Sequence, residues 1–162
     1  RDAYVCNGTY LVRSASFLSI CPDRQIFVSN GGQNWQILIP MAFHFQCGYV
    51  DKPLYHIVMR RTSHSVLPPN IGSALKRCDE LEELLLNVVL SLNVDREKYQ
   101  RIIVEKYNRK RFQIACLFGE TNQGQHYYAS ILDKKMTDRL LLIRTKYRII
   151  GFVYKSLKRF IK

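Results

Sequence analysis

The 162-residue sequence has few acidic side chains and no long apolar run. Its 13 Asp and Glu stand against 25 Lys and Arg, and residues 1–72 contain no Glu. The longest compact apolar stretch, residues 37–45, is less than half of the roughly 20 residues that a membrane-spanning helix needs. We therefore expect no helix that crosses a membrane. Because the chain begins with Arg, we expect it to be a piece of a longer protein.

The five cysteines are scattered and form no recognisable pairs. They lie at least fifteen residues apart, with no CxxC motif and no His at zinc-finger spacing. This spacing argues against a structural zinc site and against a disulfide framework. An odd, scattered set of cysteines suits a reducing compartment, so we expect a cytoplasmic protein.

Positive charge is concentrated in the second half of the chain. The net charge is +12, and residues 134–162 hold ten Lys and Arg against one acid, Asp138. Such a segment attracts anions, whether phospholipid head groups, nucleic acid or an acidic partner.

The first 66 residues read as an α/β (α+β) domain with a few short strands. Segments 4–12, 47–50 and 54–59 are rich in β-branched and aromatic residues, which favours strands. Ser14 can cap a short helix through Leu18. From Gln33 the apolar residues recur at helical spacing, with Pro40 inside the predicted helix. These apolar positions are Ile37, Leu38, Met41, Ala42 and Phe45.

Residues 67–162 read as a helical extension. One amphipathic helix is predicted over 75–92, and a second over 99–114 with Asp95 as its cap. We expect a loop at 119–125, a short helix near 126–135, and a basic amphipathic helix over 138–162. The apolar face predicted for this last helix comprises Leu140, Ile143, Tyr147, Ile150, Tyr154, Leu157 and Ile161.

Several side chains in the first part suit sugars and phosphates. Asn and Gln amides form paired hydrogen bonds with hydroxyls, and Trp35 offers an apolar face to a sugar ring. Trp35 lies two residues before Ile37, off the predicted buried face, which favours a role in a cleft. Gly31 and Gly32 before a helix N-terminus let a ligand approach the backbone. The candidate acceptor-binding residues are Asn7, Gly8, Gly31, Gly32 and Trp35.

A second group of polar residues follows in the RRTSHS stretch. Two guanidinium groups with neighbouring hydroxyls suit a diphosphate. His64 is the histidine we consider for a phosphate or metal contact, whereas His44 and His56 are interpreted as packing or surface residues. The candidate donor-binding residues are Arg60, Arg61, Ser63, His64 and Ser65.

The order of these motifs resembles a known enzyme family. NGTYLVRSASF, GGQNWQILIPMAF, CGYVDKPLY and RRTSHS follow one another as in the acceptor half of bacterial family 2 glycosyltransferases, over residues 3–66. The resemblance implies part of a GT-A fold and an enzyme of surface polysaccharide synthesis. It implies that a nucleotide sugar and Mg²⁺ or Mn²⁺ bind to a missing N-terminal half carrying an Asp-x-Asp motif. We therefore expect no metal site in this fragment, and no activity without that half.

The resemblance also raises a problem about the general base. The family keeps an Asp at this place, but Gln33 and Asn34 stand at the corresponding pair of positions. An amide can orient an acceptor hydroxyl but cannot take its proton. Asp2, Asp23, His64 or a group from the missing half could serve as base, or transfer could rely on positioning. An inactive homologue is the remaining alternative.

The basic segment 138–162 leaves two interpretations open. Its apolar face can pack on the preceding helices or on a second copy of the chain. It can also lie on an anionic leaflet at the inner face of the cytoplasmic membrane, where a lipid-linked acceptor would be found. The alternative to an enzyme is a non-catalytic basic module that binds nucleic acid or an anionic membrane. No nucleic-acid recognition motif is present, so nucleic acid is not the expected partner.

Overall fold

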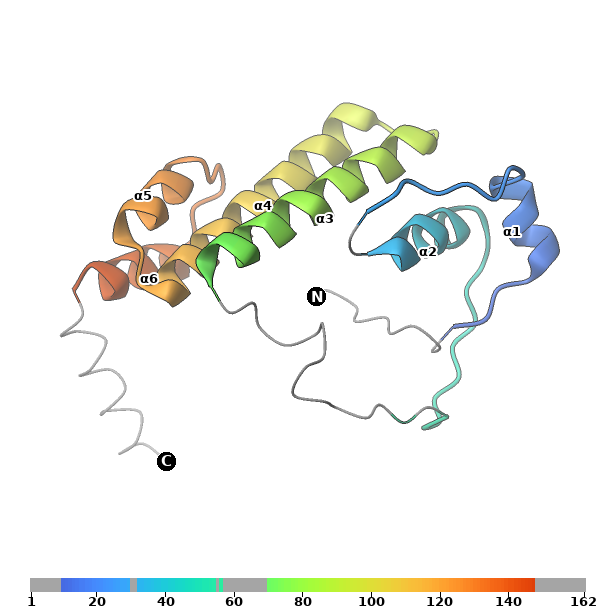
Figure 1. The fold of residues 1–162 in the computed structure, drawn as a ribbon, viewed down its shortest axis with the longest axis horizontal. Helices are drawn as coiled ribbons and strands as arrows, with labels where there is room; N and C mark the ends of the chain where they lie inside the picture. The colour runs from blue at the N-terminus through green and yellow to red at the C-terminus, as the bar shows by residue number, and fades with distance from the viewer. Residues whose placement is uncertain (1–9, 30–31, 55, 57–69, 148–162) are drawn as a thin grey trace.

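The computed structural model describes residues 10–29, 32–54, 56 and 70–147, and the regular structure within them is helical (Figure 1). The helices are α1 (Ser14–Ile20), α2 (Gln33–His44), α3 (Ile71–Ser91), α4 (Arg96–Phe118), α5 (Thr121–Ala129) and α6 (Met136–Lys146).

The expected α/β fold with short strands is wrong for this part of the chain, because the described residues contain no strand. Segment 47–50 has a strand-like composition but forms no regular structure, and Figure 1 shows it running away from α2 without a neighbouring strand. A strand is stable only when an adjacent strand pairs with its N–H and C=O groups. Most of the other two predicted strands lies outside the described residues.

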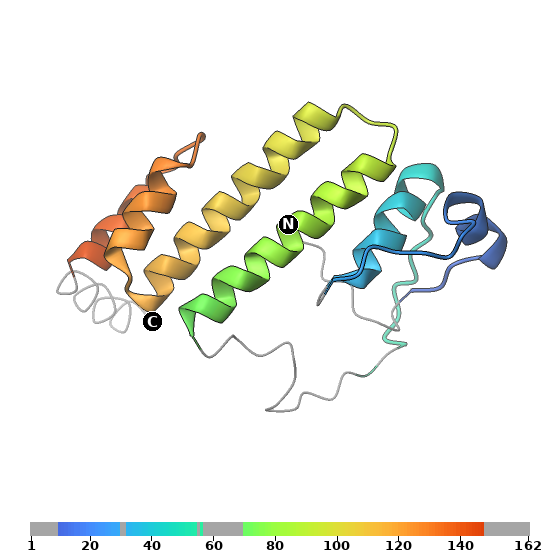
Figure 2. The same ribbon diagram turned by 45° about the horizontal axis from the view of Figure 1, so that its top comes forward.

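Helices α3 and α4 form an antiparallel pair at the centre of the molecule (Figures 1 and 2). The Asn70 side chain caps α3 by accepting from the Ser73 N–H at 2.8 Å. Asp95 caps α4 by accepting from the Lys98 N–H at 3.1 Å. The predictions of these two amphipathic helices, and of Asp95 as a cap, are confirmed.

An ion-pair cluster also joins α4 to α3. Arg111 donates from Nε and Nη2 to Asp79 Oδ1, at 3.0 and 2.6 Å, and Nη2 also contacts the Glu82 carboxylate. Burial of the guanidinium lowers its pKa, but the hydrogen bonds and charges of Glu82 and Asp79 outweigh this effect and raise the pKa overall. Arg111 therefore remains charged and fixes the register of the two helices.

The predicted loop at 119–125 is mostly helical. Gly119, with φ of 79°, ends α4, and α5 begins two residues later. Thr, Asn and Gly are weak helix formers, so the sequence pattern favoured a loop. Tertiary packing decides instead: α5 lies against α4, and Gly124 is buried where an added Cβ would lie 3.5 Å from Cys116 Sγ. The helix predicted near 126–135 ends earlier, at Ala129.

Helix α2 packs against α3, and α1 packs in turn against α2. Ser14 begins α1, but Arg13 is the N-cap and no side chain caps it. Pro40 lies inside α2, as predicted. Trp35 and Ile39 pack on a buried cluster of Leu84, Val88 and Leu92 from α3 and its end. Residues on the two sides of the predicted boundary at 66 thus share a core cluster, although the boundary itself lies outside the described residues.

The prediction of one continuous helix over 138–162 is wrong at Tyr147, which is the C-cap of α6 and has non-helical backbone angles. Helix α6 covers Met136–Lys146, and residues 148–162 lie outside the described residues. Leu140 and Tyr147 of the predicted apolar face are exposed. The residues of α6 that pack inward include Leu141 and Leu142, which were not part of that predicted face. In the part of the chain that the structure describes, no helix combines the length and the apolar character needed to cross a bilayer.

Candidate acceptor cleft

Three sequence-distant segments meet at the first turns of α2. The Tyr10 hydroxyl donates to Asn34 Oδ1 at 3.4 Å. Gln36 Oε1 accepts from the Phe27 N–H at 2.6 Å, while its Nε2 donates to the Phe27 carbonyl at 2.7 Å. The GGQNWQ motif is therefore joined to the NGTY motif before α1 and to the segment that precedes α2.

Gly32 has a structural role at this place. It is the N-cap of α2 with φ of 71°, in the left-handed region. A Cβ at Gly32 would lie 3.0 Å from Leu81 Cδ2 and 3.3 Å from Leu84 Cδ1. Gly32 thus permits both the chain reversal and the close approach of α2 to α3. Packing therefore explains a glycine at this position independently of the predicted ligand contact.

Replacing Gly32 with alanine is expected to lower the free energy of unfolding by about 2 kcal/mol, because a side chain at positive φ is strained and this one also meets Leu81. Urea unfolding followed by circular dichroism measures the loss. Gly48→Ala is the matched control, since nothing lies within 4 Å of a Cβ there. Equal losses in the two variants would contradict the packing role of Gly32.

Trp35 lies on a buried face, contrary to the expectation from its spacing. Its side chain packs against the Leu84, Val88 and Leu92 cluster, and Lys106 Nζ lies 5.7 Å from its ring centroid. The prediction for Trp35 assumed that Ile37 marks the buried face of α2. In the structure α3 contacts the side of α2 that carries Trp35 and Ile39, four residues apart.

A hollow of about 860 Å³ lies beside α2. Its walls are α1, residues 21–27, α2 with the following Phe45, and the last turns of α3. Its polar lining includes Asp23, Gln36, His44 and Asn87, and its aromatic lining includes Phe27 and Phe45. This volume falls within the range of about 300–1,000 Å³ that is typical of small-molecule sites.

The Asp23 carboxylate is oriented by its neighbours. Oδ1 accepts from the Gln25 N–H at 3.1 Å and lies 3.6 Å from Cys21 Sγ. Partial burial, together with the hydrogen bond and charge of Asp23, raises the pKa of the Cys21 thiol. The Cys21 thiol therefore stays protonated near neutral pH. Asp23 contributes a carboxylate group to the lining of the hollow.

Only some of the residues that line the hollow were predicted as site residues from the sequence. Asp23 was one of the alternatives for the general base, and it lies in the hollow. His44, interpreted as a packing or surface residue, also lines it, with its ring 4.9 Å from that of Phe43. Asn87 was missed, because a single amide within an amphipathic helix carries no signal of its own.

Most of the predicted site residues cannot be placed relative to this hollow. Gln33 begins α2, but its side chain is not among the described ones. The remaining candidates lie outside the described residues: Asn7, Gly8, Gly31, Arg60, Arg61, Ser63, His64 and Ser65. Within residues 10–29, 32–54, 56 and 70–147, no group of three or more His, Cys, Asp or Glu side chains could hold a metal ion.

The buried thiols of Cys78 and Cys116 should differ sharply in reactivity from the exposed thiol of Cys47. Desolvation by burial raises the pKa of Cys78 and of Cys116, whereas Cys47 is exposed. Since the thiolate is the reactive form, iodoacetamide at pH 8 is expected to modify Cys47 first and the two buried cysteines only after addition of denaturant. Peptide mass spectrometry assigns each site, with Cys47→Ser as the control. Rapid native-state modification of Cys78 would contradict its burial.

Comparison with known proteins adds no relative. No protein-family model, no curated protein and no solved structure matches this chain.

Proposed function

We propose that this chain forms the acceptor-binding part of a glycosyltransferase that transfers a sugar from a nucleotide sugar to a glycan or lipid-linked acceptor. The support is the contact of Tyr10 with Asn34 and of Phe27 with Gln36 at the first turns of α2. Of these four residues, Phe27 and Gln36 also line the hollow. Tyr10, Asn34 and Gln36 belong to the ordered motifs that resemble family 2 glycosyltransferases, and Phe27 lies between the first two of those motifs. The proposal concerns the reaction and this cleft, and does not depend on the α/β fold that the described residues lack.

The hollow provides chemistry suited to a sugar acceptor. Asp23 and Asn87 can hydrogen-bond to hydroxyl groups, and Phe45, which is 38% exposed, offers an apolar surface to a ring. Gln36 is fully engaged by the Phe27 backbone, so its role is to hold the wall in place. The Asn34 amide lies near the N-terminus of α2, where it can orient a hydroxyl.

In this proposal the nucleotide-sugar donor binds to residues other than those that line the hollow. The residues that the structure describes offer no carboxylate or histidine cluster for Mg²⁺ or Mn²⁺. The nucleotide-binding half and its Asp-x-Asp motif would come from chain upstream of Arg1.

The direct test is a transfer assay with the full protein that contains these residues. A panel of nucleotide sugars is supplied with Mg²⁺ or Mn²⁺, together with glycan and lipid-linked acceptors. Asn87→Ala is expected to raise the KM for acceptor several-fold, because it removes an amide from the hollow. Asn108→Ala, on α4 and outside this lining, is the matched control.

Two results would overturn the proposal. One is an upstream sequence that contains no nucleotide-binding half. The other is the absence of transfer combined with a gel shift that weakens steeply with salt. The latter would favour the alternative, a basic module that binds nucleic acid, for which the pI of about 9.7 is the motivating observation.

A further inference from the structure

Helix α6 has a face that the core does not use. Leu141 and Leu142 pack on the buried cluster of Phe112, Cys116 and Ile131, and the Thr145 hydroxyl donates to the Leu141 carbonyl at 2.8 Å. Asp138, 4% exposed, faces inward with them. These residues satisfy the packing of α6 on α4 and α5, so the opposite side is available for other contacts.

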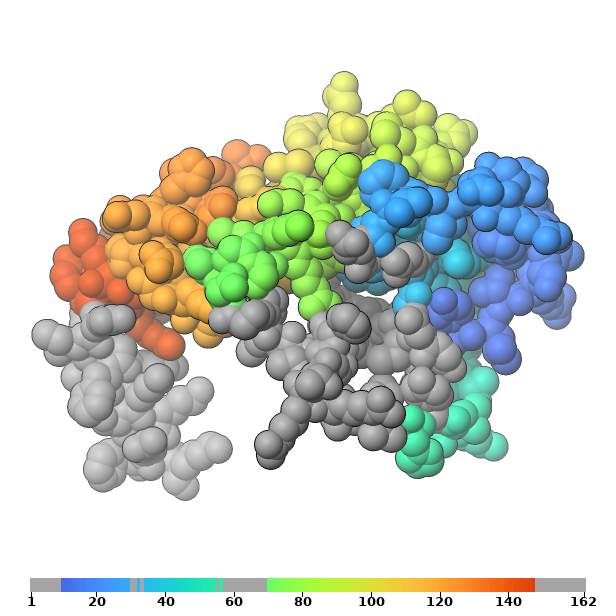
Figure 3. All heavy atoms as spheres, in the orientation of Figure 1, coloured from blue at the N-terminus to red at the C-terminus, as the bar shows by residue number. Residues whose placement is uncertain are grey.

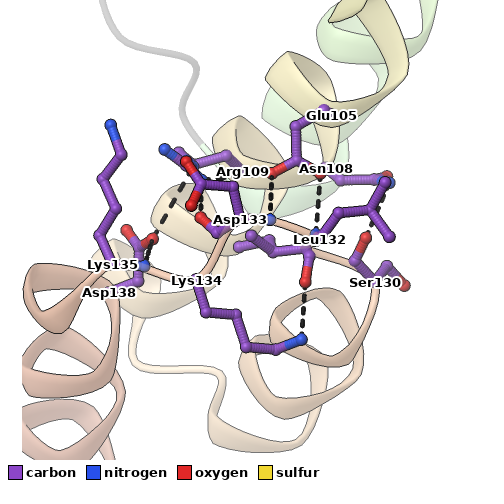
Figure 4. Close-up of polar contacts among 10 residues, drawn as sticks. Glu105, Asn108, Arg109, Ser130, Leu132, Asp133, Lys134, Lys135 and Asp138 are labelled. Atoms are coloured by element: carbon purple, nitrogen blue, oxygen red, sulfur yellow. Dashed lines mark hydrogen bonds and ion pairs between the residues drawn. The ribbon is translucent and has the colours of Figure 1, made fainter. Parts of the chain in front are cut away.

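The orientation of α6 is fixed by a polar network at its beginning (Figure 4). Asp138 Oδ2 accepts from the Lys135 N–H at 3.1 Å and lies 3.8 Å from Arg109 Nε. Arg109 also donates to the Asp133 carbonyl, and Glu105 Oε2 accepts from the Leu132 N–H at 2.9 Å. Two side chains of α4 thus hold both the loop before α6 and its first turn.

The outward side of α6 is apolar along its centre. Met136 is 68% exposed, Leu140 59% and Tyr147 52%. At about 100° per residue, these three and Ile143 fall within a sector of about 60° on the helix. Leu132, just before the helix, is also exposed. Such a stripe has no role in the folding of α6, because the opposite side already supplies its core contacts.

Positive charge borders this stripe on both sides. By the same helical spacing, Arg139 and Lys146 lie along one border and Arg144 along the other. Residues 132–147 contain five Lys and Arg against Asp133 and Asp138, and the second of these is buried. Figure 4 shows Lys135 extending away from the network. The exposed part of this segment is therefore apolar in the middle and cationic at its edges.

We propose that this face of α6 docks on an anionic lipid bilayer. Met136, Leu140 and Tyr147 would enter the boundary between head groups and acyl chains, and the flanking Lys and Arg would reach the phosphates. A second copy of the chain fits less well, because two such cationic borders would repel each other. Nucleic acid gains little from a central aliphatic stripe.

The proposal goes beyond the transfer reaction and stands independently of it. Figure 3 shows α6 at the end of the molecule opposite α1, away from the hollow beside α2. Membrane binding by α6 therefore leaves the candidate acceptor cleft open, and either property can be present without the other.

The test is sedimentation of the full chain with vesicles of phosphatidylcholine alone and of phosphatidylcholine with about a third phosphatidylglycerol. We expect binding to the anionic vesicles only, weakening as salt is raised. Leu140→Asp and Met136→Asp are each expected to lower the partition coefficient about tenfold or more. Arg139→Glu combined with Lys146→Glu is expected to remove the preference for anionic lipid.

Ile102→Asp is the matched control, because Ile102 is a 53% exposed aliphatic residue within α4. It should bind vesicles like the unaltered chain. Circular dichroism of each variant is the check that its helices are retained. Unchanged binding of both the Leu140 and Met136 variants would overturn the proposal. So would equal binding to neutral vesicles. A self-association in solution that Leu140→Asp abolishes would assign the face to a second copy instead.

Discussion

Replacing Phe112 with alanine is expected to lower the free energy of unfolding by about 3–5 kcal/mol, which is the usual cost of emptying a buried aromatic site. Phe112 is 0% exposed and packs with Cys116 and Ile131, and its ring lies 5.5 Å from that of Tyr128. The same cluster includes Leu141 and Leu142 from α6. One side chain of α4 therefore supports both α5 and α6.

The measurement is urea unfolding followed by far-ultraviolet circular dichroism. Tyr99→Ala serves as the control, because Tyr99 lies on the same helix but is 42% exposed, and its loss should cost less than about 1 kcal/mol. Hydrogen exchange locates the effect: amides of α5 and α6 should lose more protection than those of α3, which does not belong to this cluster. Similar losses in Phe112→Ala and Tyr99→Ala would contradict this description of the core.

The long helices were predictable because their evidence is local. In α3 and α4 the apolar residues recur at helical spacing over more than five turns, and Asp95 is a typical N-cap residue immediately before α4. The predictions failed where the evidence is not local. The composition of residues 47–50 predicted a strand, but the described residues contain no second strand that could pair with it. Helix α5 forms although its residues have weak helix propensity, because it packs on α4.

The same distinction applies to the candidate site. The spacing of the motifs led to Asn34, and the structure places Tyr10 beside it although the two are 24 residues apart. The direction in which Trp35 points could not be read from the sequence, because it depends on where α3 crosses α2. Asn87 reaches the hollow only because the end of α3 passes beside α1 and α2.

Replacing Asn34 with aspartate in the full protein is expected to raise the rate of sugar transfer by about 10²-fold, the lower end of what a positioned general base contributes. Under the proposed function, Asn34 occupies the position that corresponds to the catalytic Asp of the family that residues 3–66 resemble. Its Oδ1 already accepts from the Tyr10 hydroxyl at 3.4 Å, and a carboxylate of the same shape can keep that contact. The change therefore adds basicity with little change in geometry.

The gain should depend on pH in a defined direction. Only the ionised carboxylate can take the proton of an acceptor hydroxyl, so the gain is present above the pKa of the new Asp, ordinarily about 4, and is lost as the pH falls through it. Asn87→Asp is the matched control, because it makes the same chemical change on α3, in the lining of the hollow, and should not raise the rate. If Asn34→Asp leaves the rate unchanged, another group takes the proton. Asp23, which lines the hollow beside α2, is then the next residue to replace.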